Sequence, residues 1–439
     1  MTEKMMRLGF LMEGQGYAWN DWRHPKVQPD AMYDFEYFKH QVQTLERGLF
    51  DFCFIADNIY TTANAAPIAV SRLEPVTLLA GLAAVTKHIG LAGTVSCTYS
   101  EPFNVARFFA SLDHISRGRA AWNVVTSYLP DSGTNFSQSG LPDHDLRYKS
   151  AGEHLAVVRG LWDTWEDDAM VQDKASGVFL DKSKVHELNY RGEYYQCKGP
   201  INIARPPQGH PVIFQAGDSD VGRTFAARHA DGIFCVPVMV EEAREFYTDI
   251  KSRAASLGRD PSKILIFPNI RIFVGRTRAE AQEKYRERVA LIGIDDGLAR
   301  LSKFCDGFNF AGHDVDAPFP EEVFRQRTRG LQGHVKKIER IVRAEQLTLR
   351  QVVQRLGWPS DLFVGSAQDV ADLMQHWFET GAGDGFMVVD GRPGDYGDIV
   401  DLLVPELQKR GLFRTAYEGT TLRDRLGLAR PANASGSDG

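Results

Sequence analysis

The feature that most constrains this chain is an alternation of short apolar runs with longer segments of helical periodicity. Each run is rich in β-branched and aromatic residues and apolar on both faces, which is typical of parallel strands covered by helices on both sides. The eight runs are residues 6–12, 50–57, 89–97, 119–126, 212–217, 232–238, 264–275 and 385–390. Helices are expected to follow them near 34–48, 74–87, 103–117, 147–165, 219–229, 241–257, 277–292 and 397–411.

Eight such units most simply close into an α/β TIM (β/α)8 barrel, and a doubly wound sheet is the alternative. Three stretches, near 127–146, 166–211 and 293–366, are too long for simple connections and are expected to be insertions that cap the barrel. Residues 1–425 would then form a single domain. The final residues, 426–439, are expected to be a disordered tail.

Composition excludes several classes of function. The net charge is -6 and the 51 basic residues are scattered, which argues against nucleic-acid binding. No apolar run reaches the roughly 18 residues that a membrane span needs. The five cysteines are odd in number and far apart, so we expect buried free thiols and a cytoplasmic location.

Barrel enzymes place their chemistry at the C-terminal ends of the strands. Here those ends carry few acids, bases or metal ligands, and neither H-x-H nor H-E-x-x-H occurs, so no metal is expected. A glycosidase would need two carboxylates at strand ends, and Asp57 and Asp390 are the pair that could serve. We retain that reading as a distant alternative.

The segment "AGDSDVG", residues 216–222, follows the fifth expected strand and begins a helix. Its second glycine comes one residue too late for the nucleophile elbow G-x-S-x-G. Ser219 is instead expected to cap the helix, where free N–H groups and the helix dipole would bind a phosphate. The alternative is an ordinary helix cap without a ligand.

The run "RAAWNVVT" places a side-chain amide, that of Asn123, inside a strand expected to be buried. A buried amide needs hydrogen-bond partners. A phosphate site beside strand ends that lack catalytic groups indicates an organic cofactor, and a flavin ring could supply those partners. A hydrogen bond to a neighbouring strand is the alternative.

Four longer segments, "GRAAWNVVTS", "DHDLRYKSAGEHLAVVRGLWDTWEDDA", "KVHELNYRGEYYQCKGP" and "PVIFQAGDSDVGRTFAARHADGIF", carry a resemblance to a known family. They resemble the nitrilotriacetate monooxygenase type of flavin-dependent monooxygenase, within the bacterial-luciferase-like superfamily. That group includes EDTA, dibenzothiophene-sulfone and long-chain alkane monooxygenases. The resemblance runs from about residue 6 to residue 425.

The resemblance implies a two-component enzyme in a TIM barrel. Reduced FMN (FMNH2) would come from a separate NAD(P)H:FMN reductase and react with O2 to give a flavin peroxide or an N5-oxygenated flavin. That species would oxygenate a small organic substrate at a C–N, C–S or C–H bond. A homodimer or homotetramer is also expected.

Site residues follow from the matching positions. The resemblance implies that Ser219 and Gly217, with the Tyr148 hydroxyl and His144, hold the phosphate of FMN. It implies a catalytic role for Asn123, facing the flavin ring. The remaining implied flavin contacts are Asp57 in "IADN" and Thr94 in "GTVS".

One position departs from the relatives. Tyr128 stands where the alkane-oxygenating relatives have histidine, so it is expected to lie near the substrate with a catalytic role. Aromatic residues of the first loops could form the wall of the substrate pocket, or they could simply pack on the rim. These residues are Tyr17, Trp19, Trp22 and Tyr60.

Two alternatives to this function stay open. The first is a deazaflavin-dependent oxidoreductase of the same superfamily, against which "DHDLRY" and "KVHELNYRGEYY" argue. The second is a non-catalytic flavin-binding protein, which would not require such large insertions.

Overall fold

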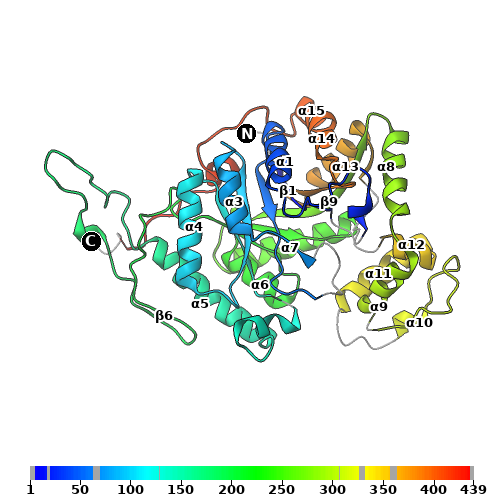
Figure 1. Ribbon diagram of the computed structural model, residues 1–439, viewed down its shortest axis with the longest axis horizontal. Helices are drawn as coiled ribbons and strands as arrows, with labels where there is room; N and C mark the ends of the chain where they lie inside the picture. The colour runs from blue at the N-terminus through cyan, green and yellow to red at the C-terminus, as the bar shows by residue number, and fades with distance from the viewer. Residues whose placement is uncertain are drawn as a thin grey trace.

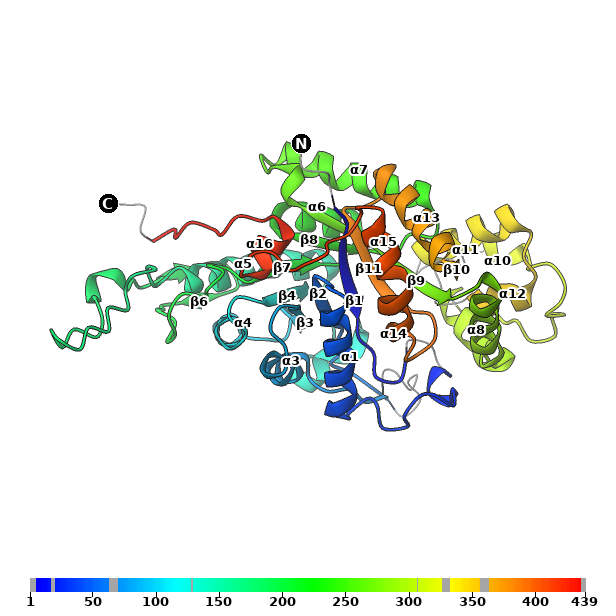
Figure 2. The same ribbon diagram turned by 90° about the horizontal axis from the view of Figure 1, so that it is seen from above.

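We examined the protein as a computed structural model, which describes residues 5–16, 20–62, 70–127, 129–305, 307–325, 332–355 and 363–435. A barrel of strands and helices lies at the centre, and two insertions project from its opposite sides (Figures 1 and 2). None of the described helices is long and apolar enough to span a membrane.

The eight expected strands are present, and they form one closed parallel barrel. Its order is β9-β11-β1-β2-β3-β4-β7-β8, and β8 pairs with β9 to close the ring. The strands are β1 (Arg7–Leu11), β2 (Phe52–Ile55), β3 (Gly90–Ser96), β4 (Ala120–Val125), β7 (Val212–Gln215), β8 (Gly232–Cys235), β9 (Leu265–Gly275) and β11 (Gly385–Asp390). The TIM barrel prediction is confirmed and the doubly wound sheet is excluded.

Helices surround the barrel where the periodicity places them. The outer ring contains α1 (Phe35–Arg47), α3 (Pro75–Ala84), α4 (Pro102–Ser116), α5 (His144–Trp162), α6 (Asp220–His229), α7 (Val240–Ser256), α8 (Arg278–Ala290), α13 (Ala367–Glu379), α14 (Tyr396–Asp398), the π-helical turn η5 (Ile399–Leu403) and α15 (Val404–Lys409). Their N-termini begin at local signals such as the Asp34 side chain, which accepts from the Glu36 N–H. Helix α13 is absent from the sequence-based expectations.

Aromatic side chains fill the inside of the barrel. Phe214 stacks on Phe234 with ring centroids 4.8 Å apart, and the Phe52 ring lies tilted against it at 4.7 Å. Gly232 makes room for them, since a Cβ there would lie 2.3 Å from the Phe214 ring. The interior is therefore a packed core rather than a pore. A larger core lies between the strands and the outer helices.

The three expected insertions have different structures. The first contains the 3-10 helix η2 (Pro130–Phe136). The second forms an arm with η3 (Lys182–Lys184) and a hairpin of β5 (Tyr190–Arg191) and β6 (Gln196–Cys197). The third has its own small core around α9 (Ile294–Phe304), α10 (Glu322–Arg325), α11 (Gln332–Glu345) and α12 (Leu349–Arg355), ending at β10 (Val364–Ser366). Short 3-10 turns also occur at η1 (Asp21–Arg23) and η4 (Pro261–Lys263).

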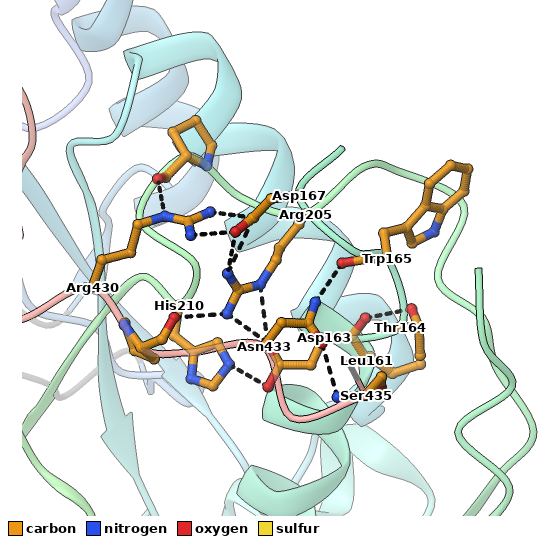
Figure 3. Close-up of polar contacts among 12 residues, drawn as sticks. Leu161, Asp163, Thr164, Trp165, Asp167, Arg205, His210, Arg430, Asn433 and Ser435 are labelled. Carbon is orange, nitrogen blue, oxygen red and sulfur yellow. Dashed lines mark hydrogen bonds and ion pairs between the residues drawn. The ribbon is translucent and has the colours of Figure 1, made fainter. Parts of the chain in front are cut away.

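The C-terminal residues differ from the expected disordered tail. After α16 (Leu422–Leu426), the described residues 427–435 run along the base of the arm. Asp167 of the arm forms ion pairs with Arg430 and Arg205, and Arg205 also donates to the Pro431 carbonyl at 2.9 Å (Figure 3). Contacts with residues far away in the sequence thus hold a segment whose composition predicts disorder.

All five cysteines are free thiols, as expected. Burial raises the pKa of both Cys53 and Cys97 to about 12. At neutral pH neither is a thiolate, so neither can act as a nucleophile.

Candidate active site

A layer of polar side chains lies above the aromatic core, at the C-terminal end of the barrel. Residues of a strand alternate between the two faces. Ala92 and Ala121 belong to the barrel interior, so Thr94 and Asn123, two positions further, face inward as well. The same alternation from Leu11 and Phe267 turns Glu13 and Arg271 inward. The barrel mouth therefore has a polar floor contributed by strands β1, β3, β4 and β9.

Asn123 is the most informative residue of this floor, because it is 3% exposed. Its Nδ2 donates to Thr94 Oγ1 at 3.0 Å, and Thr94 Oγ1 donates to the Ile55 carbonyl at 3.0 Å. Its Oδ1 is buried and has no hydrogen-bond partner among the described residues. The hydrogen bond to a neighbouring strand, which the sequence left as an alternative, is therefore present. It satisfies the amide nitrogen and leaves the amide oxygen without a partner among the described residues.

A cavity of about 80 Å³ opens beside this floor. It is lined by Asp57, Asn58, Ile59, Thr94, Ser96, Val125, Ser127, Leu129 and Ser132. Burial raises the pKa of Asp57 to about 6, although Arg72 opposes the shift. The structure thus brings Asp57 and Thr94 together as walls of one cavity, next to Asn123.

A cradle for an anion lies at the N-terminus of α6. Ser219 caps the helix by accepting from the Gly222 N–H at 3.1 Å, and its hydroxyl lies 3.3 Å from His144 Nε2. The Tyr148 hydroxyl faces two glycines, since a Cβ added to Gly217 or Gly222 would lie 3.0 or 2.8 Å from it. A helix N-terminus with two hydroxyls and an imidazole has the donors that a phosphate needs.

Two details of this cradle depend on the fold. The cradle follows β7, the fifth strand of the barrel, as the sequence predicts, whereas phosphate sites in TIM barrels more often follow the seventh and eighth strands. His144 is the first residue of α5, which Asp143 caps, so the helix begins three residues earlier than the sequence predicted. The helix start and the ring contact with Tyr148 at 5.1 Å fix its position.

Arg147 is a residue of this region that the sequence reasoning missed. It is 9% exposed, and its Nη1 donates to the carbonyls of Thr126 and Ser127, directly after β4. Ser127 has a φ of 52° and its hydroxyl lies 2.8 Å from that of Ser96. Arg147 therefore holds the loop that follows Asn123, and the RY pair in "DHDLRY" was the available signal.

The expected substrate residues can be followed only in part. Tyr17, Trp19 and Tyr128 lie outside the residues that the structure describes. Tyr60 donates to Asp131 at 3.3 Å, which ties the loop after β2 to η2, and Trp22 is 44% exposed. Among the described residues of this set, Tyr60 contacts the segment that contains Leu129 and Ser132, which line the cavity.

Other kinds of catalytic site receive no support from the described residues. No group of three or more His, Cys, Asp or Glu side chains within them is arranged to hold a metal ion. Asp390, the other carboxylate considered for a glycosidase, follows Val389 of the barrel interior and so turns to the outer face, where it accepts from the Gly394 N–H. Asp57 and Asp390 do not face a common substrate position.

The chain is similar to known proteins over almost its whole length. The family model described as luciferase-like monooxygenase matches residues 18–384. N-acetyl-S-(2-succino)cysteine monooxygenase of Bacillus subtilis (strain 168) is 42% identical over 434 residues, covering 98% of both chains. Nitrilotriacetate monooxygenase component A of Aminobacter aminovorans is 42% identical over 448 residues, covering 99% of this chain and 98% of that one.

A solved structure gives the same result in three dimensions. The crystal structure of long-chain alkane monooxygenase superposes with a TM-score of 0.83 at 35% identity, covering 97% of this chain and 96% of that one. Similarity of this extent includes the barrel, the arm and the outer helices. With its polar barrel mouth and the cradle at α6, this chain is a flavin-dependent monooxygenase and belongs to the luciferase-like monooxygenase family.

Proposed function

We propose that this protein is the oxygenase of a two-component system, which takes reduced FMN from a separate NAD(P)H:FMN reductase and uses O2 to oxygenate a small organic substrate. The observation that carries the proposal is the anion cradle at α6 beside the polar barrel mouth, on the same end of the barrel. A flavin mononucleotide has a phosphate for the first and a polar ring for the second. One relative is named component A of a nitrilotriacetate monooxygenase, which supports a separate second component such as a reductase.

The residues fit such a cofactor. Ser219, His144, Tyr148 and the close approach allowed by Gly217 would hold the phosphate, as the missing Cβ atoms leave room for it. The unpartnered Asn123 Oδ1 would accept a hydrogen bond from an N–H of the ring. Asp57 and Thr94 would contact the ribityl chain or the ring edge from the cavity wall.

The chain's own contribution is binding, orientation and exclusion of water. When bound, reduced FMN supplies the electrons that activate O2. Asn123 and Thr94 would orient the ring, the phenylalanine core closes the barrel below them, and Arg147 holds the loop that follows β4. Tyr128, with Tyr17, Trp19 and Tyr60, remains our candidate set for contact with the substrate.

The printed names of the relatives support a small organic substrate. They act on nitrilotriacetate, dibenzothiophene sulfone, dimethyl sulfide and long-chain alkanes, which span C–N, C–S and C–H chemistry. We therefore propose oxygenation at one of these bonds in this chain. A homodimer or homotetramer is part of the same proposal, and light scattering at micromolar concentration tests it.

A stopped-flow experiment tests the function. Protein with photoreduced FMN under anaerobic conditions is mixed with oxygenated buffer, and absorbance is followed without substrate and with a panel of sulfones, amines and alkanes. The proposal predicts a transient that differs from reduced and oxidised FMN and that one substrate class shortens. Tight binding of oxidised FMN with uncatalysed reoxidation would instead favour the flavin-binding protein. Selective binding of a deazaflavin, without oxygen consumption, would favour the deazaflavin enzyme.

A further inference from the structure

Glu13 is an acid at the barrel mouth for which the proposed cofactor contacts give no role. It follows β1, where the Met12 N–H still donates to the Phe54 carbonyl at 2.9 Å, so the strand geometry continues to this position. Leu11 faces the barrel interior and Met12 the outer core, which turns Glu13 back toward the interior. Its side chain is 12% exposed. The carboxyl therefore belongs to the same polar floor as Thr94 and Asn123.

Two arginines lie near Glu13, but neither donates a hydrogen bond to its carboxyl. Arg72 Nη2 lies 4.0 Å from Glu13 Oε2, beyond hydrogen-bond distance, and its Nη1 donates instead to the Ala56 carbonyl at 2.9 Å. Arg271 of β9 and Asp57 after β2 are the other charged groups that act on this carboxyl. None of the described residues donates a hydrogen bond to it.

Burial outweighs both arginines. It raises the pKa of Glu13 to about 7, with Asp57 adding to the increase. A general acid or base works best when its pKa lies near the working pH. Both forms of Glu13 are therefore populated at neutral pH, on the floor of the proposed flavin site.

We propose that Glu13 is the proton relay of the oxygenation reaction and that Arg72 is its positioning residue; this rests on the proposed function. The overall reaction takes two electrons and two hydrogens from reduced FMN, adds one oxygen atom to the substrate and releases the other as water. Neutral Glu13 gives its proton to the oxygen that leaves as water. Of the two protons that the flavin releases, one completes that water molecule and the carboxylate takes back the other, so Glu13 ends the cycle unchanged.

The test compares Glu13→Gln with Asp390→Asn. Glutamine keeps the shape of the side chain and cannot relay a proton. Asp390 is the matched control, because burial raises its pKa to about 7 as well but the side chain faces away from the barrel mouth. We expect turnover of Glu13→Gln to fall about 100-fold or more, with the neutral-pH ionisation gone from its pH profile. The affinity for FMN should change less than about twofold. Asp390→Asn should keep that ionisation.

Two further measurements keep the proposal falsifiable. In the ligand-free protein, infrared difference spectra should contain a protonated-carboxyl band at neutral pH that Glu13→Gln lacks. Arg72→Gln removes a cation that favours the carboxylate, so the ionisation in the pH profile should move to higher pH.

The outcomes separate this proposal from the proposed function. If the wild type oxygenates a substrate and Glu13→Gln does so with the same pH profile, the relay is overturned and the function stands. If Asp390→Asn instead loses the neutral-pH ionisation, that ionisation belongs to Asp390, and the relay by Glu13 is overturned. If the wild type consumes no oxygen with reduced FMN, the function and the relay both fall.

Discussion

At the scale of single residues, Asn123 divides its amide between two kinds of partner. The nitrogen is bound to Thr94 on the neighbouring strand, while the oxygen is buried without a partner among the described residues. A buried unsatisfied oxygen costs roughly 1–3 kcal/mol. No described residue donates to this oxygen, and a donor on a bound ring would satisfy it.

Replacing Asn123 by Ala should separate binding from coupling. The phosphate cradle at α6 stays intact, so flavin affinity should fall by less than about tenfold, the effect of one hydrogen bond. The ring loses its fixed orientation, so O2 consumption should continue while hydrogen peroxide replaces product. An oxygen electrode with a peroxidase assay measures the ratio. Full coupling in this variant would leave Asn123 with a purely structural role.

Ser219 allows a second prediction because the chain contains a matched serine. Ser219→Ala should weaken FMN binding about tenfold, as one hydrogen bond to a charged phosphate is lost, and should leave riboflavin binding unchanged. Ser366→Ala is the control: Ser366 also caps a helix, α13, on the outer ring. Each variant should lose about 1 kcal/mol of stability. Isothermal titration with both flavins tests this, and equal FMN affinities in the two variants would remove Ser219 from the phosphate site.

At the scale of elements, the arm and the C-terminal segment support each other. Asn433 Nδ2 donates to the Trp165 carbonyl at 2.7 Å, and Arg430 Nε donates to the Pro207 carbonyl at 3.0 Å (Figure 3). Asp167 lies between Arg430 and Arg205. These polar contacts add to the apolar packing of both segments, since Ile201 of the arm and Leu428 of the C-terminal segment each belong to a buried core.

Asp167→Asn should release the C-terminal segment. Hydrogen bonds from Arg430 and then Arg205 lower the pKa of Asp167 to about 2. A lowered pKa means that the carboxylate stabilises the fold fully above the ordinary aspartate pKa, about 3.9. That stabilisation is lost as the pH falls from there toward about 2. We expect carboxypeptidase to remove residues 428–435 faster from the variant at pH 7, and from the wild type only in acid. Equal digestion rates at pH 7 would contradict this account.

At the scale of the whole molecule, the barrel depends on its aromatic interior. Phe214 is fully buried and contacts Phe52, Phe234 and Phe267 across the ring of strands. The strands that supply these rings are far apart in the chain. The layer therefore holds the closed barrel together and supports the polar floor above it.

Phe214→Ala should destabilise the protein by about 3–5 kcal/mol, the usual cost of a cavity of this size in a core. Phe108→Ala is the matched control, because Phe108 on α4 is 49% exposed, and its loss should change stability by less than about 0.5 kcal/mol. Urea unfolding followed by circular dichroism measures both. A similar shift of the midpoint in the two variants would show that the aromatic layer is not what stabilises the barrel.

The sequence by itself determined the strands, most helices and the capping role of Ser219. Each of these depends on residues close together in the chain: a run buried on both faces must be apolar throughout, and a cap acts within one helical turn. The family motifs predicted His144 and Tyr148 as phosphate contacts. No pattern within one segment predicts that they lie beside the N-terminus of α6.

Only the tertiary structure decided which groups share the barrel mouth and where residues 427–435 lie. Glu13 after β1 and Arg271 of β9 are distant in sequence, and Arg271 acts on the Glu13 carboxyl because closing the barrel turns alternate residues of each strand into one interior. Burial then raises the pKa of Glu13, and the residues near it in the sequence do not reveal that burial. The prediction for residues 427–435 was wrong for the same reason: their composition is that of a disordered segment, but Asp167, Arg205 and Trp165, which folding brings beside them, hold them in place.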